Sequence, residues 1–441
     1  MRIVACGDAL FSSRNLANRL DPDMVREFRS ADGVFANAEF CCPRHDTPPA
    51  PRRFVTAVRP ETLDEFRDLN IRLLSFANNH AGDFGPQGVV DTIEAAESRG
   101  LLAGGIGRSL FEARAARFID TPQGRIGLIA TSSTRSAEFT ASAPGNGIMA
   151  RPGLNPLRWG RAYVLPDQEF AQLQRIDELL GTAASRREVA VAEVMRDTGP
   201  DKFAFGSVFE GSLQIERGDH AHVRYYADER DEKAILDNVR DAANRCDFVL
   251  LSLHTHEGTA ENWYSARPAS FIEAFSRKAI EAGAHAVVGH GAHMLRGVEI
   301  HQGRPIFYNL SSLIMEFEAG EQMMTPEMYE GFGLKNDPLP SHMHMSRVKD
   351  AKGNWIGFYN DRRFAKSCYA VLDMEGGKIR IKLVPLDLDM QRARAAERGV
   401  PAPASAAVGQ EIARDLMQMS EIYGTRLRYV EADGCIHVET N

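Results

Sequence analysis

The sequence predicts an α/β fold in which a largely buried sheet carries helices on its faces. Two observations lead to this prediction. Short apolar runs with the length of buried strands alternate with segments of helical periodicity, and the alternation returns after an interruption in the middle of the chain. With 441 residues, 44% of them hydrophobic and 25% charged, the chain suits one α/β domain with insertions and is too apolar to be disordered.

The first third of the chain holds the first block of predicted strands and helices. Each predicted strand is a short apolar run, and each predicted helix has apolar residues on one face. Pro122-Gln123-Gly124 separates two of the strands and has the composition of a hairpin turn. In chain order we expect strand 3–6, helix 22–29, strand 33–37, helix 61–69, strand 73–77, helix 88–99, strand 118–121 and strand 125–131.

The second half of the chain repeats this pattern. We expect helix 232–244, strand 248–253, helix 270–282, strand 286–288, strands 297–300 and 306–310 around a turn, strands 367–373 and 378–385, helix 409–423, and strands 426–430 and 435–438. Residues 1–366 are therefore expected to form one sandwich, and residues 367–441 to supply strands and a helix that complete the same domain.

Two segments interrupt the α/β pattern and are expected to be inserted lids. The first, at about 154–226, has helical periodicity over 167–197, broken near Gly181, and strand-like segments over 203–226. The second, at about 316–364, carries Met, Gly, Pro and His with little periodicity. Long insertions inside a compact domain are usually functional.

Composition excludes several classes of protein. The formal net charge of −8 argues against a nucleic-acid partner, which would require a basic surface. No apolar run approaches the roughly 20 residues of a membrane anchor. Residues 1–8 resemble a buried strand rather than an export signal, so a cytoplasmic location is expected. Six scattered cysteines provide no zinc-binding CxxC pair. The sequence leaves the oligomeric state open.

Polar side chains cluster where the predicted strands end. In open α/β sheets the carboxyl ends of the strands form the ligand site, so five strand ends are expected to meet at one edge. The residues concerned are Asp8, Asn37, Glu39, Asn78, Asn79, His80, Asp83, His254, His256, His290 and His293.

This set of side chains is suited to a metal site. Carboxylate, amide and imidazole ligands fit Mn²⁺, Fe²⁺ or Zn²⁺, and the cluster has no cysteine. One or two ions are expected, and Glu39 is the candidate for a bridging carboxylate. A two-metal site can activate water at neutral pH and stabilise both the attacking and the leaving oxygen.

Several short motifs occur in a fixed order along the chain. They are Gly7-Asp8, Asn37-Ala38-Glu39, Asn78-Asn79-His80-Ala81-Gly82-Asp83-Phe84-Gly85, Gly104-Gly105-Ile106-Gly107, Gly289-His290-Gly291-Ala292-His293 and Tyr308-Asn309-Leu310. Together they resemble the CapA family, named for poly-γ-glutamate capsule biosynthesis. The resemblance covers residues 1–131 and about 240–313, with a weaker similarity over 367–438. It implies a four-layer α/β sandwich of the calcineurin-like metallophosphoesterase type.

The resemblance also implies roles for individual residues. His80 would polarise the substrate or protonate the leaving group, and Arg14 would hold an anionic group of the substrate. Asn78 and His256 are expected to contact substrate. The implied metal ligands are Asp8, Glu39, Asn79, His254, His290 and His293.

Three functions remain open on the sequence. The preferred one is metal-dependent hydrolysis of an amide or phosphoester bond in a peptide or an amino-acid-derived anionic substrate. The second follows from the lasso-peptide epimerase branch of the same family: a peptide α-carbon epimerase that needs no metal and pairs Asp8 with His290 or His293 as acid and base. The third is a non-catalytic assembly protein of polymer biosynthesis.

Overall fold

Strand β1 (Arg2–Ser12) lies in the middle of the larger of the two main sheets. The structure is a computed structural model that describes residues 1–193, 199–207, 209, 211–320, 323–334 and 339–439. The sheet runs in the order β21-β22-β19-β18-β1-β2-β3-β4, with β17 paired to β1 and β20 paired to β19. Its other strands are β2 (Gly33–Ala38), β3 (Ile71–Ser75), β4 (Leu102–Gly104), β17 (Ser312–Gly320), β18 (Lys366–Glu375), β19 (Lys378–Asp387), β20 (Ala402–Pro403), β21 (Leu427–Val430) and β22 (Cys435–Val438).

A smaller sheet packs against the larger one. Its order is β15-β16-β14-β13-β7-β6, and β7, β13, β14 and β16 are parallel. The strands are β6 (Arg117–Thr121), β7 (Gly124–Ser132), β13 (Phe248–Thr255), β14 (Ala286–Gly291), β15 (Val298–His301) and β16 (Arg304–Phe307). Apolar side chains of both sheets, such as Phe35 and Leu250, share one buried cluster between them.

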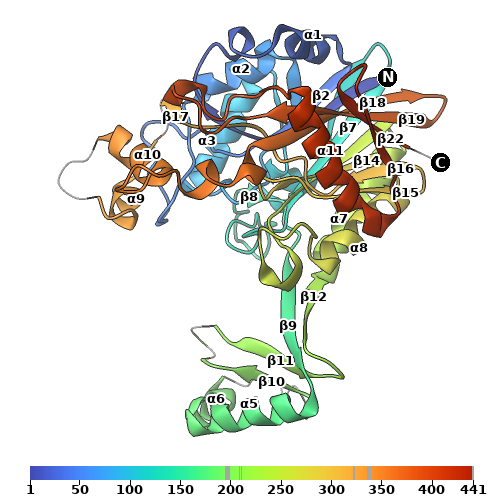
Figure 1. The fold of residues 1–441 in the computed structure, drawn as a ribbon. Helices are drawn as coiled ribbons and strands as arrows, with labels where there is room; N and C mark the ends of the chain where they lie inside the picture. The colour runs from blue at the N-terminus through green and yellow to red at the C-terminus, as the bar shows by residue number, and fades with distance from the viewer. Residues whose placement is uncertain (194–198, 208, 210, 321–322, 335–338, 440–441) are drawn as a thin grey trace.

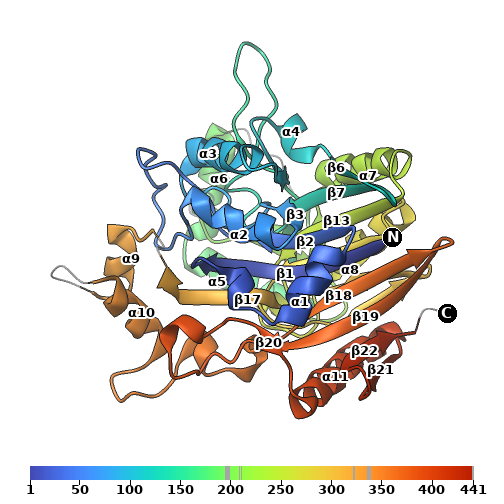
Figure 2. The same ribbon diagram turned by 90° about the horizontal axis from the view of Figure 1, so that it is seen from above.

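Helices cover the two outer faces and complete four layers (Figures 1 and 2). Side chains of α1 (Pro22–Ser30), α2 (Leu63–Asp68) and α3 (Gly85–Glu97) form one core with the larger sheet, and those of α7 (Glu229–Ala243) and α8 (Ser270–Glu281) form another with the smaller sheet. Helix α11 (Ala406–Ser420) packs against β15, β19 and β21. The predicted four-layer α/β sandwich is confirmed.

Strand β1 shows why this sequence is buried on both faces. Ile3 and Ala5 point into the core between the sheets, whereas Val4 and Cys6 belong to the core beneath the helices. A period of two places successive side chains on opposite faces, so a strand covered on both faces is apolar throughout. The C-terminal strands β18, β19, β21 and β22 extend the same sheet beyond β1.

The first insertion forms a lobe with its own sheet, in the order β10-β11-β9-β12. Figure 1 shows the lobe joined to the body through β9 and β12, with its helices at the end remote from the two large sheets. The predicted helical segment 167–197 is two helices that separate at Gly181 (φ +76°), and residues 194–197 lie outside the described residues. The elements are β9 (Trp159–Leu165), α5 (Asp167–Leu179), α6 (Thr182–Ala192), β10 (Lys202–Phe205), β11 (Leu213–Arg217) and β12 (His222–Ala227).

The second insertion starts later than the sequence predicts. Residues 316–320 were expected in a loop, but they belong to β17, which pairs in parallel with the end of β1. Pairing with a partner distant in sequence supplies the strand that local periodicity does not indicate.

In the described part of the chain, no helix combines the length and apolar character that crossing a bilayer requires.

The remaining elements are short. They are α4 (Leu110–Arg114), β5 (Ile106–Gly107), β8 (Gly153–Leu154), α9 (Pro326–Gly331), α10 (Pro340–Val348) and the 3-10 turns Leu16–Asn18, Pro60–Thr62, Thr259–Glu261, Gly357–Tyr359, Arg362–Phe364, Ala395–Glu397 and Glu421–Tyr423.

Candidate metal centre

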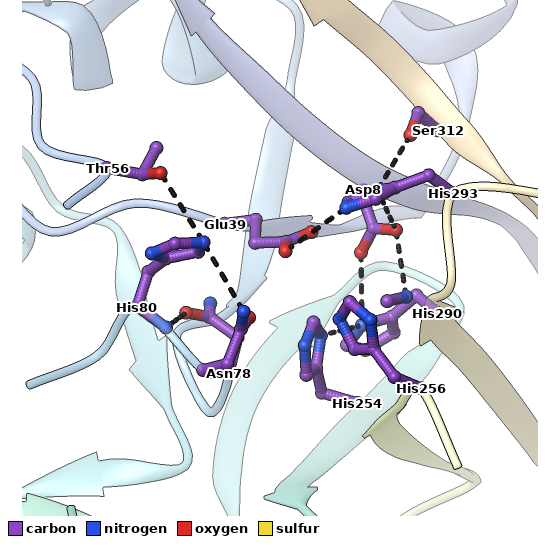
Figure 3. Close-up of polar contacts among 12 residues, drawn as sticks. Asp8, Glu39, Thr56, Asn78, His80, His254, His256, His290, His293 and Ser312 are labelled. Carbon is purple, nitrogen blue, oxygen red and sulfur yellow. Dashed lines mark hydrogen bonds and ion pairs between the residues drawn. The ribbon is translucent and has the colours of Figure 1, made fainter. Parts of the chain in front are cut away.

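Polar side chains meet at the carboxyl ends of strands from both sheets (Figure 3). Asp8 lies in β1, Glu39 follows β2, and His254 and His290 lie in β13 and β14. The sequence placed Asp8, His254 and His290 after their strands. The strands instead continue through these residues, because Asp8 is in register with β2 and His254 is in register with His290.

Asp8 is the most highly connected carboxylate of the centre. It is fully buried, and it accepts hydrogen bonds from Asn37 Nδ2 (2.8 Å) and from the Gly291 backbone N–H (2.8 Å). Its oxygens lie 3.3 Å from His290 Nδ1 and 3.2 Å from His293 Nδ1. Burial alone would raise the pKa of Asp8, but the hydrogen bonds and charges of these two histidines outweigh it and hold that pKa well below its usual range.

The first candidate metal-binding group is Asp8, His254 and His290, whose ligand atoms lie within 4.8 Å of one another. His290 Nε2 hydrogen-bonds with Ser252 Oγ at 2.7 Å, which fixes its ring and leaves Nδ1 facing the centre. Gly291 makes room for this arrangement. A Cβ at Gly291, whose φ is +113°, would lie 2.9 Å from His254 Cε1.

The second candidate group, equally close, is Glu39, His256 and His293. His293 Nε2 faces Glu39 Oε1 at 3.5 Å, and its Nδ1 lies 3.2 Å from Ser312 Oγ. His293 adopts φ +56°, a left-handed conformation that costs a non-glycine residue roughly 1 kcal/mol or more. Strain of this kind persists where the surrounding structure needs the side chain in one place.

The buried atoms of both groups test whether a cation fits. Both carboxylate oxygens of Glu39 and the Nε2 atoms of His254 and His256 are buried with no hydrogen-bond partner among the described residues. Burial, reinforced by the Asp8 charge, raises the pKa of Glu39, and burial beside other histidines lowers the pKa of His254 and His256. Neutral imidazoles and unpartnered carboxylate oxygens are what a divalent ion binds, so these residues fit Mn²⁺, Fe²⁺ or Zn²⁺.

His80 lies on the Glu39 side of the centre (Figure 3). His80 Nδ1 donates to Asp83 Oδ2 at 2.6 Å, and its Nε2 lies 3.4 Å from Thr56 Oγ1 and from Asn79 Nδ2. Asn78 accepts from the His80 backbone N–H at 3.0 Å. These contacts fix the ring of His80 and leave Nε2 as the atom that can exchange a proton with a ligand.

Three other predicted site residues lie at the centre, and two of them have a different contact from the predicted one. Asn79 Oδ1 is buried and has no hydrogen-bond partner among the residues that the structure describes, so it is open to a ligand. His256 was expected to contact substrate, but it belongs to the second candidate metal group. Asn78 donates its amide to Asn37 Oδ1 and the Ala38 carbonyl, so it positions His80 and has no free group for substrate.

Arg14 is not brought to the centre. Its Nε lies 3.0 Å from Glu65 Oε1 on α2, and its side chain is 49% exposed. Substrate binding by Arg14 would require this ion pair to break.

Sequence reasoning missed two residues that support the centre. Ser252 lies two positions before His254 on β13, and this spacing places both side chains on one face of the strand, which could have identified it. Arg296 is fully buried, and it donates to the backbone carbonyls of His256 (2.9 Å) and Trp263 (3.0 Å). No sequence signal indicates Arg296, because its partners are backbone atoms.

Comparison with known proteins gives relatives of similar length. The uncharacterized protein y4sH of Sinorhizobium fredii is 30% identical over 99% of this chain and 93% of its own length. A probable polyglutamine synthesis accessory protein of Mycobacterium tuberculosis is 23% identical over 79% of this chain and 73% of its own length.

Solved structures show weaker similarity. A hypothetical protein from Thermus thermophilus aligns with 88% of this chain and 99% of its own at 13% identity and a TM-score of 0.40. A putative 5′-nucleotidase from Staphylococcus aureus aligns with 88% of this chain and 52% of its own at 10% identity and a TM-score of 0.36.

A family model described as "Bacterial capsule synthesis protein PGA_cap" matches residues 2–316, which include every residue of both candidate metal groups. The chain therefore belongs to this family of bacterial capsule synthesis proteins, as its sequence motifs indicated.

Proposed function

We propose that this protein is a metal-dependent hydrolase that cleaves an amide or phosphoester bond in a peptide or an amino-acid-derived anionic substrate. One observation carries the proposal: two candidate metal groups lie side by side, and each contains buried ligand atoms that have no hydrogen-bond partner in the described part of the chain. Asp8 connects them, because it belongs to the first group and contacts His293 of the second. Adjacent sites of this kind are typical of enzymes that displace a group from phosphorus or carbon.

Divalent ions bound here would polarise the scissile bond and lower the pKa of water. The chain's own residues supply the remaining steps. Asp8 and Glu39 contribute the negative charge that holds cations, and the surrounding histidines exclude bulk water from the buried edge. His80 Nε2 would give a proton to the leaving group, and Asp83 keeps the ring of His80 in the orientation for this transfer.

The α-carbon epimerase is less compatible with this geometry. Such an enzyme needs an acid and a base on opposite faces of one carbon atom. The oxygens of Asp8 lie 3.2 to 3.3 Å from ring nitrogens of His293 and His290, so these groups face one another directly, as ligands of a shared cation do. This contact favours hydrolysis over epimerisation.

The experiment combines metal analysis with a turnover assay in D₂O. Untagged wild type and His290→Ala are analysed by plasma mass spectrometry and assayed on phosphoester and dipeptide panels, with His301→Ala as the control. We expect one or two Mn, Fe or Zn ions per chain, and hydrolysis that chelation abolishes and re-addition of metal restores. Hydrolysis and the ion of the first group should be lost only in His290→Ala.

Two outcomes would overturn the proposal. Deuterium in recovered, uncleaved peptide would identify the epimerase. Folded wild type with no metal and no turnover would favour the assembly protein.

A further inference from the structure

A pocket of about 540 Å³ opens where the inserted lobe joins the body. Its lining includes Trp159 of β9 and Tyr225 of β12, whose ring centroids lie 6.0 Å apart, together with Trp263. Figure 1 shows these strands leaving the body at this point. The volume is within the range of pockets that enclose a small ligand, such as a dipeptide.

The pocket borders the candidate metal centre on two sides. Trp263 packs against the ring of His256, with ring centroids 4.5 Å apart. On the other side, Glu138 lies 3.9 Å from Arg52, which in turn lies 3.2 Å from Asp83, the partner of His80. A ligand in the pocket would therefore be separated from His256 by Trp263, and it would be linked to His80 through Glu138, Arg52 and Asp83.

Most charged groups that line the pocket are already engaged. Arg158 makes a two-pronged ion pair with Asp231 at 2.6 and 2.8 Å, and Arg161 pairs with Glu261. The buried carboxylate of Glu257 accepts hydrogen bonds from three neighbouring hydroxyl groups. These groups maintain the walls and have little capacity left for a ligand.

Arg135 differs from the other two arginines of the pocket. Its one ion pair among the described residues is weak, with Nη1 3.9 Å from Glu138 Oε2, and its side chain is 40% exposed. Its backbone adopts φ +52°, a strained conformation for a residue with a side chain. A strained residue that presents an underused guanidinium in a pocket beside a metal centre is suited to bind an anion.

We propose that this pocket is the substrate subsite and that Arg135 binds a carboxylate of a peptide-like substrate. The aromatic side chains that line the pocket would contact the apolar part of a peptide unit, and the planar guanidinium matches a carboxylate with two hydrogen bonds. This inference rests on the proposed hydrolase function, and it names the group that recognises the substrate in place of Arg14.

Tryptophan fluorescence can test it, because two of the three tryptophans in the chain, Trp159 and Trp263, line the pocket. The test uses the full chain as purified, with Trp355→Phe to remove the third signal. The probes are N-acetyl-diglutamate, its uncharged diglutamine amide and inorganic phosphate. Each is titrated into the parent protein, Arg135→Gln, Arg135→Lys and a control, Arg125→Gln, which lies at the opposite end of β7.

We expect diglutamate to bind, and Arg135→Gln to weaken binding by about 10-fold to 100-fold, the loss expected for a charge-assisted pair. Arg135→Lys should retain more affinity than Arg135→Gln, and Arg125→Gln should match the parent. Three outcomes would overturn the carboxylate assignment. The uncharged amide could bind as tightly as diglutamate, Arg135→Gln could keep the affinity of the parent, or phosphate could bind more tightly than diglutamate in a way that depends on Arg135. Fluorescence measures binding without turnover, so this result can be interpreted even if the protein is not a hydrolase. Hydrolysis of uncharged substrates without any diglutamate binding would refute the subsite and leave the hydrolase proposal intact.

Discussion

His254 and His290 are register partners on the adjacent parallel strands β13 and β14, and their Nδ1 atoms lie 3.2 Å apart. Two unprotonated ring nitrogens at this distance repel each other unless they share a proton or bind the same cation. His290 already uses Nε2 to bond Ser252, so its Nδ1 is the atom available for that purpose. The parallel register of the smaller sheet thus builds half of the candidate centre.

The two candidate groups predict separable metal sites. His254→Ala should remove about one ion per chain and leave the ion of the second group, because His254 belongs only to the first group. His256→Ala should have the converse effect. The measurement is metal content by plasma mass spectrometry, with the circular dichroism spectrum as a check on folding.

The matched control for this experiment is His301→Ala. His301 pairs with Glu281 on the surface and belongs to neither group, so its removal should leave metal content unchanged. Complete loss of metal in both single variants would show one shared site instead of two.

Asp83→Asn should lower kcat by about 100-fold with little change in KM or metal content, since Asp83 orients His80 and is not a candidate ligand. Steady-state kinetics on the substrate that the panels identify would measure kcat and KM separately. Asp120→Asn, an exposed carboxylate on the β6–β7 hairpin, is the control. A rise in KM alone would assign Asp83 to substrate binding.

Local pattern was sufficient to predict most of the fold. The strands are short apolar runs because both sheets are covered on both faces, and such runs are visible in the sequence. The pattern failed at Asp8 and His254, where a polar residue after an apolar run resembles the end of a strand. Both residues are buried inside strands, where the Asn37 amide contacts the Asp8 carboxylate and Nδ1 of His254 and compensates part of their polarity.

The side-chain directions at the site were less predictable. Asp8 and His290 follow from the rule that strand ends meet at one edge. His256 and Arg14 lie beyond strand ends, where periodicity gives no direction. The chain after β1 turns toward α2 and pairs Arg14 with Glu65, an outcome that depends on tertiary packing.

Arg296→Met should destabilise the protein by about 3 kcal/mol, because four backbone carbonyls around His256 lose the buried guanidinium that now satisfies them. Burial lowers the pKa of Arg296 to about 10, so it is still charged at neutral pH. Urea unfolding would measure the change. Arg125→Met, which removes an exposed ion pair, should leave the free energy of unfolding almost unchanged, and equal losses in the two variants would contradict the assignment.

His285 should make stability depend on pH outside the metal centre. Its Nδ1 accepts a hydrogen bond from the Val249 backbone N–H at 3.1 Å, and its ring stacks on Phe248. Burial, assisted by the Arg304 charge, lowers the pKa of His285 from 6.5 to about 4. The unfolded chain therefore binds a proton more readily than the folded chain between these values. Stability should fall by roughly 3 kcal/mol as the pH decreases through this window.

The comparison of wild type with His285→Asn isolates this effect. Asparagine retains an acceptor for the Val249 N–H and does not titrate, whereas every candidate metal ligand is the same in both proteins. Urea unfolding at several values between about pH 7 and pH 4 should show wild type losing stability faster than the variant as the pH falls. The same pH dependence in the two proteins would contradict this prediction. It would mean that the folded chain accepts a proton on His285 as readily as the unfolded chain, so the pKa of His285 is not lowered by folding.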